Sequence, residues 1–238
     1  MAAFVLRLWV PDRPGALGAV ASRIGAVRGD LLGIDILERG GGRAIDELIL
    51  DLPDAELVPL LVSEVSQVDG VDVEDVRPMT DPGTDPRLDA LETAASLVCS
   101  GHVEALLEIL AEQALRDFQA EWSAVVDTGS PLPVVTVGSP PPAPWLAAFV
   151  AGSRASVAPV VGDNAPDDVA WADLASAGLV VVLGRRGRPF RTRERRQLGA
   201  LSNIADHRWV ELVSRRAPKR GPVGARDRGL TAEVGSKS

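Results

Sequence analysis

Residues 10–17, VPDRPGAL, combine residue types that can form a small anion-binding site. They follow an apolar run, FVLRLWV, and precede a segment whose apolar residues recur every three or four positions, as in a helix. We expect Pro14 to open that helix, because its backbone angle is already helical and it has no N–H to satisfy. The glycine that follows leaves the N–H groups of Gly15, Ala16 and Leu17 unshielded at the positive end of the helix dipole. The loop therefore predicts a site for a carboxylate or a similar anion.

Other residues that often carry chemistry do not occur in patterns that support it. His102 and His207 lie in helical segments without an HExxH motif, a nucleophile elbow or a carboxylate pair. Cys99 is the single cysteine and has no Cys or His at zinc-binding spacing, so we interpret it as a small apolar helix residue. The stretch GGGR at 40–43 lacks the GK[ST] ending of a phosphate-binding loop. We expect no enzyme activity, no metal and no cofactor.

The composition predicts a folded protein with an acidic body and a basic end. Of the 238 residues 46% are apolar and 4% aromatic, so the core must be built from Val, Leu, Ile and Ala. No apolar run approaches the roughly 20 residues of a membrane span, and the start of the chain lacks a signal-peptide pattern, so we expect a cytoplasmic protein. The net charge is −8, yet residues 214–238 hold seven basic and two acidic side chains. We expect this tail to be disordered and to be the one part that could touch nucleic acid, since an acidic body repels phosphates.

The first eighty residues alternate strand-like and helix-like patterns. Gly29 should end the first helix, the glycines at 40–42 should form a hairpin turn, and Pro59 should delay the start of the second helix beyond Asp54. The expected order is a strand at 4–10, a helix that Pro14 opens and that runs to about 28, strands at 31–38 and 43–52, a second helix, and a strand at 71–76. A βαββαβ order of this kind predicts a ferredoxin-like sandwich, with both helices on one face of an antiparallel sheet.

A proline-rich stretch separates this domain from a second one. We place the N-terminal domain at 1–79, a linker at 80–86, a second domain at 87–213 and the basic tail at 214–238. The second domain is predicted to be α+β with a central antiparallel sheet. Its expected elements are helices at 87–99 and 102–118, strands at 121–127 and 133–138, a helix with Trp145 and Phe149, a hairpin at 168–185, and a long helix with Thr192 as N-cap.

The DRPGAL loop in its βαββαβ setting resembles the ACT domain, a small regulatory module that binds amino acids, over about residues 3–79. In that family the loop and helix start of one copy commonly face the start of the second strand of a neighbouring copy, with the effector between them. The resemblance implies a homodimer. It also implies a ligand site made by Asp12, Pro14, Gly15, Ala16 and Leu17 on the loop side and by Asp30, Leu31 and Leu32 on the facing strand.

An α-amino acid or similar zwitterion fits these residue types. Its carboxylate would accept from the helix N–H groups, and its ammonium would meet Asp12 or Asp30. Many amino-acid-binding members carry His or Asn in the loop and Asn at the strand start, where this chain has Val10, Asp12 and Leu31. The alternative interpretation is a turn without ligand, in which Asp12 caps the local backbone and Arg13 points into water.

The second domain resembles the closing half of a GAF domain. The similarity lies in the WADL strand, the apolar strand ending in LGR and the PFRTRERRQL helix, within residues 168–210. GAF domains hold cyclic nucleotides, haem, bilins, other small molecules or nothing. Trp145, Phe149 and Trp171 would face such a pocket, but we interpret them as core. Cys99 lies in the early helices, so bilin attachment is excluded. Seven arginines between 185 and 196 are interpreted as a solvated or dimer-forming helix face rather than a phosphate site.

Two functions from different classes follow. The first is a non-catalytic sensor that binds an amino acid at the dimer interface of its ACT-like domain and shifts the pose of its GAF-like domains. The second is an interaction protein without a small ligand, which dimerises through both modules and recruits a partner with its basic tail. A ligand screen by thermal shift separates them.

Overall fold

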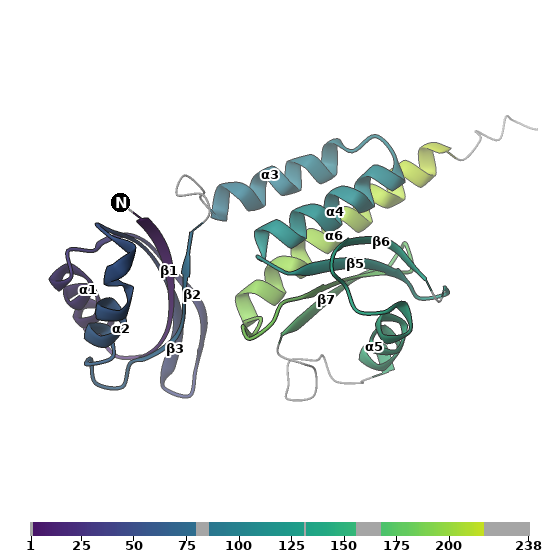
Figure 1. Cartoon of the computed structure of the whole chain (residues 1–238). Helices are drawn as coiled ribbons and strands as arrows, with labels where there is room; N and C mark the ends of the chain where they lie inside the picture. The colour runs from purple at the N-terminus through teal and green to yellow at the C-terminus, as the bar shows by residue number, and fades with distance from the viewer. Residues whose placement is uncertain (1, 80–85, 131, 156–167, 217–238) are drawn as a thin grey trace, which may run out of the picture.

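The chain forms two α+β domains, each built on a four-stranded antiparallel sheet (Figure 1). The computed structural model describes residues 2–79, 86–130, 132–155 and 168–216. The α+β class expected from the alternating patterns is confirmed.

The N-terminal domain has the predicted βαββαβ order. Its sheet runs β2-β3-β1-β4, so β2 and β4 are the edge strands. The elements are β1 (Ala2–Pro11), α1 (Ala16–Ala26), β2 (Asp30–Gly40), β3 (Arg43–Leu52), a 3-10 turn (Ala55–Leu57), α2 (Val58–Val65) and β4 (Asp72–Pro78). The hairpin between β2 and β3 turns at Gly41 and Gly42, both with positive φ, as the glycine run predicts.

The two faces of this sheet are different in character. Alternate residues of β1 and β3, including Leu6 and Leu48, pack under α1 and α2 and form the domain core. The opposite face carries charged residues among apolar ones, with Arg7 paired to Glu47 across the two central strands. This second face meets the other domain instead of water, because Arg7 also hydrogen-bonds to the carbonyl of Pro189. The predicted sandwich is therefore confirmed, with a partner for its open face.

The start of α2 and the end of α1 show how local interactions set the helix boundaries. Asp54 caps the 3-10 turn by accepting from the Glu56 N–H, and Pro59 lies in the first turn of α2, so the predicted delay is confirmed. The prediction that Gly29 ends α1 is wrong in detail: α1 ends at Ala26, and the left-handed residue is Arg28, with φ 59°. Gly29 is needed for space, because a Cβ there would lie 2.8 Å from the side chain of Ile24.

The second domain is a sheet of order β6-β5-β8-β7 between two helical layers. Helices α4 and α6 cover one face, α3 packs against these two helices, and α5 covers the other face (Figure 1). The elements are α3 (Pro86–Cys99), α4 (Val103–Asp117), β5 (Trp122–Asp127), β6 (Pro133–Gly138), α5 (Ala143–Ala155), β7 (Val169–Leu174), β8 (Leu179–Gly184) and α6 (Thr192–Arg216). Each predicted element of this domain is present.

The start of α6 differs from the prediction by one residue. Thr192 is the first helical residue, not the N-cap. The N–H of Arg191 donates to Oε2 of Glu194 at 2.8 Å, which is the half of a capping box that a glutamate at the third helical position supplies. The glutamate, not the threonine hydroxyl, therefore fixes this helix start.

Two predicted segments fall outside the described part of the chain. These are the linker, of which residues 80–85 are not described, and the basic tail beyond residue 216. Among the helices that are described, none combines the length and the apolar character needed to cross a bilayer.

Candidate functional site

The loop before α1 has a different geometry from the one predicted. Gly15 precedes the helix with a left-handed φ of 86°, and α1 begins at Ala16. Pro14 therefore lies in the turn and does not open the helix, so that prediction is wrong. A Cβ at Gly15 would meet nothing within 4 Å, which means that the backbone angle, and not crowding, calls for glycine.

The backbone N–H groups at the start of α1 are largely unoccupied. Ala16 donates to the carbonyl of Arg13 at 3.3 Å, so one of the three predicted amides is engaged by a long hydrogen bond. For the N–H groups of Gly15 and Leu17, the described residues provide no acceptor, and no side chain caps the helix. The first turn of α1 contains no acidic residue that would neutralise the dipole.

The rest of the loop is held by its backbone. The Asp12 N–H donates to the carbonyl of Gly42 at 2.9 Å, which ties the loop to the β2–β3 turn. Arg13 makes one exposed contact of 3.5 Å with Asp69. The carboxylate of Asp12 accepts no hydrogen bond from the described residues and is exposed. Asp12 is thus available to a ligand and does not cap the local backbone.

Asp46 on β3 is a member of this region that sequence reasoning missed. It lies opposite Leu8 on β1 and Ile36 on β2, on the face that α1 and α2 cover, and it is only 4% exposed. Its Oδ1 has no hydrogen-bond partner among the described atoms. Burial raises the pKa of Asp46, the nearby charge of Asp12 raises it further, and Arg39 opposes both. A buried carboxyl that lacks a full set of partners therefore lies within electrostatic reach of the loop.

The strand side of the predicted site is far from the loop within one chain. Asp30, Leu31 and Leu32 begin β2, and Leu31 pairs with Leu50 near the end of β3. The loop follows Pro11, which pairs with Arg43 at the opposite end of β3. A strand of this length spans about 30 Å. One copy therefore separates the two halves of the predicted site, with Asp30 and Leu32 exposed and Leu31 partly buried against the helices.

Comparisons with known proteins give fold neighbours of the N-terminal part. No protein-family model matches the chain, and no curated protein matches its sequence. The solved ACT domain from the GTP pyrophosphokinase of Chlorobium tepidum is 15% identical, with a TM-score of 0.27, over 33% of this chain and 97% of that chain. An uncharacterized protein from Thermotoga maritima is 24% identical, with a TM-score of 0.27, over 33% of this chain and 98% of that chain.

A third structure, an unknown protein from Galdieria sulphuraria, extends further. It is 12% identical, with a TM-score of 0.29, and the match covers 53% of this chain and 68% of that chain. The assignment of the ferredoxin-like fold rests on the strand order and the one-sided helices described above.

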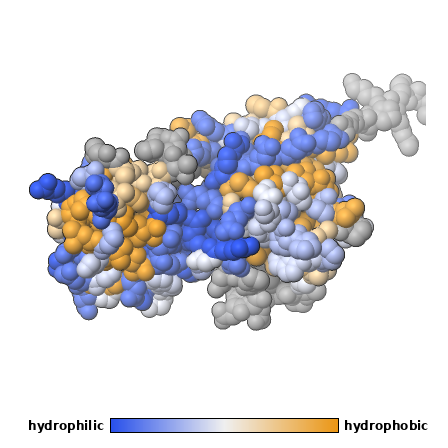
Figure 2. Space-filling view, viewed as in Figure 1, coloured by the Kyte–Doolittle hydropathy of each residue, from blue (hydrophilic) through white to orange (hydrophobic). Residues whose placement is uncertain are grey.

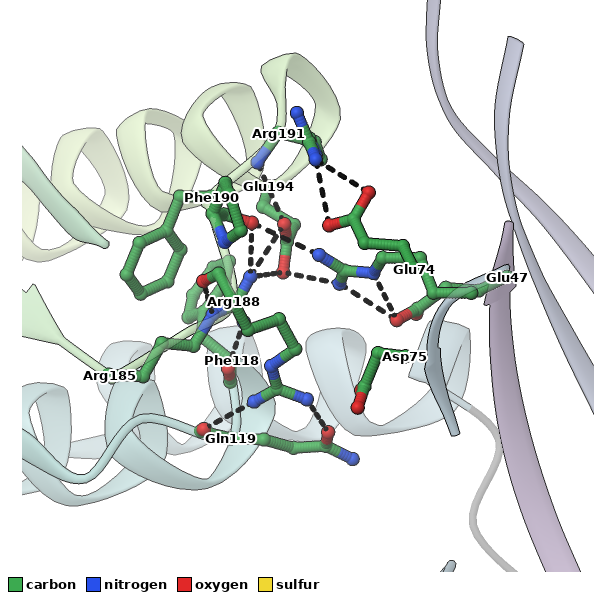
Figure 3. A network of polar contacts seen from close by, with 12 residues as sticks. Glu47, Glu74, Asp75, Phe118, Gln119, Arg185, Arg188, Phe190, Arg191 and Glu194 are labelled. Carbon is green, nitrogen blue, oxygen red and sulfur yellow. Dashed lines mark hydrogen bonds and ion pairs between the residues drawn. The ribbon is translucent and has the colours of Figure 1, made fainter. Parts of the chain in front are cut away.

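The arginine cluster is not the solvated helix face that its sequence predicts. Arg185 is 4% exposed and donates to the carbonyl of Phe118 at 2.7 Å and to that of Pro189 at 2.9 Å. It also lies 2.8 Å from Glu194 (Figure 3). On the facing sheet, Arg7 is 1% exposed and contacts Glu47 at 2.7 Å. Guanidinium groups that lose water are here satisfied by carbonyls and carboxylates.

Further ion pairs join the two domains along the same junction. Arg191 contacts Glu74 at 2.6 Å, and Arg193 contacts Asp35 at 2.6 Å. Figure 2 shows hydrophilic residues gathered where the domains meet. Arg186 and Arg196 are exposed, as predicted. The carboxylate partners lie more than 100 residues earlier in the chain, so the sequence pattern of the helix alone could not reveal them.

The aromatic residues of the second domain form a local cluster on the α5 face of its sheet. Trp145 stacks on Phe149 at 5.2 Å between centroids and meets the edge of Trp122 at 6.2 Å. Trp122 is buried, Phe149 and Trp171 are partly buried, and Trp145 is exposed. The core interpretation therefore holds for part of this set. Residues 156–167, which follow α5, are outside the described chain.

His102 and Cys99, the other candidate residues named from the sequence, have positions that a structural role explains. His102 caps α4 by accepting from the N–H of Ala105 at 3.1 Å, and Cys99 is exposed at the end of α3. Within the described ranges no three His, Cys, Asp or Glu side chains are grouped so that they could hold a metal ion.

Proposed function

We propose that the protein is a regulatory module that binds an amino acid or a similar small zwitterion at the head of α1. Two observations carry the proposal: the buried Asp46 carboxyl, which has an unpartnered oxygen and lies within electrostatic reach of Asp12, and the start of α1, where the N–H groups of Gly15 and Leu17 have no acceptor among the described residues. These two features have opposite charge preferences, and a zwitterion satisfies both.

The electrostatics of the loop favour this class of ligand over a simple anion. The N–H groups of Gly15 and Leu17 would donate to the ligand carboxylate. The ammonium would lie toward Asp46 and Asp12, because burial and, to a smaller extent, the charge of Asp12 disfavour the ionised form of Asp46 and raise its pKa. A plain carboxylate ligand would add a third negative charge to that pair, so it should bind less well.

The dimer that completes the site would form along the β2 edge. β2 is an edge strand and carries exposed apolar side chains at Leu32 (51%), Ile34 (37%) and Ile36 (38%). An open apolar strand edge is a surface on which another strand pairs. If two β2 strands pair antiparallel, the start of one lies beside the end of the other, which brings the partner's Asp30 and Leu32 to the loop from which one copy separates them.

The ion pairs between the domains would transmit a change in the first domain to the position of α6 in the second. Arg193 of α6 contacts Asp35, which lies on the same strand as the proposed dimer edge. A ligand that binds one arrangement of β2 more tightly would shift the position of α6 by that difference in affinity. We retain the GAF-like assignment of the second domain as part of this proposal.

Thermal unfolding with the twenty amino acids tests the function. A ligand at about 100 times its Kd adds about 2.7 kcal/mol, which raises the Tm of a chain of this size by roughly 5–10 °C. Asp46→Asn and Asp12→Ala should each reduce the shift, while Glu108→Gln, an exposed change on α4, should leave it intact. Equal shifts in all four proteins would mean that the site is elsewhere.

The second candidate is a dimerisation module without a small ligand, and the exposed apolar side chains of β2 favour it independently. A flat screen, combined with a dimer that persists in ligand-free protein, would leave this function alone.

A further inference from the structure

Helix α3 exposes a stripe of apolar side chains, and the proposed function does not use it. Leu88, Leu91 and Val98 are 52%, 68% and 54% exposed, and Ala95, which lies between the last two, is exposed as well. The intervals between these four residues are three, four and three positions, which places them on one side of the helix. Aliphatic side chains that are exposed together on one helix face are typical of an interaction surface.

The opposite side of α3 is buried, so this helix is apolar on two sides. Leu97 is fully buried and Ala94 packs beside it in the core of the second domain. Figure 1 shows α3 on the outside of the helical layer, where it packs on α4 and α6. A helix that had only to cover α4 and α6 would carry polar side chains on its outer side. Packing within one copy therefore does not explain the stripe.

The end of the chain, residues 217–238, does not match the stripe. This sequence has three large apolar residues, Val223, Leu230 and Val234, together with four glycines and two prolines. A segment that covers the stripe must offer apolar residues at helical spacing, and glycine and proline disfavour a helix. The composition of residues 217–238 thus argues against them as the occupant.

The α3 helix of a second copy does match the stripe. Apolar residues that recur alternately after three and four positions form the contact side of paired helices, where each side chain inserts between those of the partner. A two-fold contact uses the same surface on both copies, so this surface must be complementary to itself. The stripe contains no charged residue, so two copies bring no like charges face to face within it.

The position of Glu92 favours a parallel pair. Glu92 is exposed and flanks the stripe on one side. In a parallel two-fold pair, the two Glu92 side chains lie on opposite sides of the contact. An antiparallel pair aligns the four apolar levels only when its axis lies at residue 93. Both Glu92 side chains then lie on the same side, one residue from that axis, where like charges repel each other.

The length of the stripe limits the strength of the contact. From residue 88 to residue 98 the helix rises by about 15 Å. A standard stable interface buries about 800 Å² on each partner, which is more than four aliphatic side chains provide. A contact of this size forms at high protein concentration and dissociates on dilution.

We propose that α3 is a self-association surface, on which the α3 helix of a second copy packs in parallel in a weak, concentration-dependent contact. This inference depends neither on the ligand site at α1 nor on pairing through β2. A chain that also pairs through β2 is joined to other copies at two surfaces, so the α3 contact then extends or closes the assembly.

Sedimentation equilibrium over a range of protein concentrations tests the contact. It is measured in Ile34→Lys, because this change removes the pairing proposed for the β2 edge. The average mass should rise from that of a monomer toward that of a dimer as the concentration increases. Adding Leu91→Glu should raise the Kd of this association about 100-fold or more, because each contact loses two buried leucines.

Val210→Glu is the matched control. It also replaces an exposed apolar residue by glutamate, but on α6, so it should leave the Kd unaltered. Near-UV circular dichroism should show that each variant keeps its tertiary structure.

Cys99, the one cysteine of the chain, reports the direction of the pair. It is exposed at the end of α3, so a parallel pair brings both cysteines to the same level, and bismaleimidohexane should cross-link them. An antiparallel pair separates them by about 18 Å along the helix axis. Leu91→Glu should abolish the cross-link.

Three results would overturn the proposal. They are a monomer mass at every concentration, a Kd that Leu91→Glu and Val210→Glu change equally, and association without a cross-link at Cys99. A mass that rises with concentration in the unmodified chain but not in Ile34→Lys would place self-association on β2 alone and would also overturn it.

Discussion

Replacing Asp117 by Asn should stabilise the protein in a pH-dependent way. The pKa of this carboxyl rises from 3.8 to about 6 on folding, chiefly because burial disfavours its charged form. A group with a raised folded-state pKa stabilises the fold fully below about pH 4 and loses that contribution as the pH rises through about 6. A shift of about two units corresponds to about 3 kcal/mol, which partial solvation reduces to about 2 kcal/mol.

The asparagine variant removes this loss, since its side chain stays neutral and can still accept from Thr93. The free energy of unfolding of Asp117→Asn should therefore exceed that of the parent by about 2 kcal/mol at pH 8 and equal it near pH 4. Urea unfolding of both proteins between pH 4 and 8 measures the difference. Glu112→Gln on the same helix should change stability by less than about 0.5 kcal/mol at every pH.

Two results would refute this reasoning. If the gain from asparagine were the same at pH 5 and pH 8, the ionisation of the carboxyl would not be its source. If Asp117→Asn were less stable than the parent at pH 8, the ionised carboxylate would be making favourable contacts that outweigh its burial.

Three other perturbations test the loop, the junction and the edge. Gly15→Ala should lower the free energy of unfolding by about 1–2 kcal/mol, because Gly15 has a left-handed backbone. Gly18→Ala, in the first turn of α1, should raise it by about 0.5–1 kcal/mol. Urea midpoints that move in the same direction for both variants would contradict this assignment. Arg7→Met should lower the free energy of unfolding by about 3–5 kcal/mol, because it removes a buried partner of Glu47 and Glu194. Arg186→Met, at an exposed position, should change it by less than about 0.5 kcal/mol in the same urea measurement. Ile34→Lys should convert a β2-paired dimer to monomer in light scattering, and a mass that does not change would exclude β2 as the contact.

The N-terminal fold follows from the sequence because its signals are local. Alternating apolar residues, the glycine run at 40–42 and the proline early in α2 each act over a few residues, and each has the expected outcome. The prediction for Pro14 is wrong because its preference for the first helical position competes with the left-handed Gly15, which moves the helix start two residues on, to Ala16.

The candidate site is less accessible to sequence reasoning. Asp46 lies in the strand sequence RAIDELILDL, which allows two alternations of inward-facing residues. Ile45 favours the odd-numbered positions, which would leave Asp46 on the opposite face. Leu48 and Leu50 favour the even-numbered positions, which place Asp46 on the face covered by the helices, as the structure shows. Choosing between the two frames requires the pairing of β1 with β3. The arginines near 190 likewise have partners on strands of the other domain, and a helical pattern has no information on such distant contacts.

The buried guanidinium of Arg7 bears on how the chain can be divided for experiments. It belongs to the first sheet, yet its Nη1 donates to the carbonyl of Pro189 and its Nη2 lies 3.6 Å from Glu194. A fragment cut in the linker would expose this face to solvent and strip it of both acceptors. Affinities measured on such a fragment would describe a differently hydrated sheet, so effector titrations belong on the undivided polypeptide.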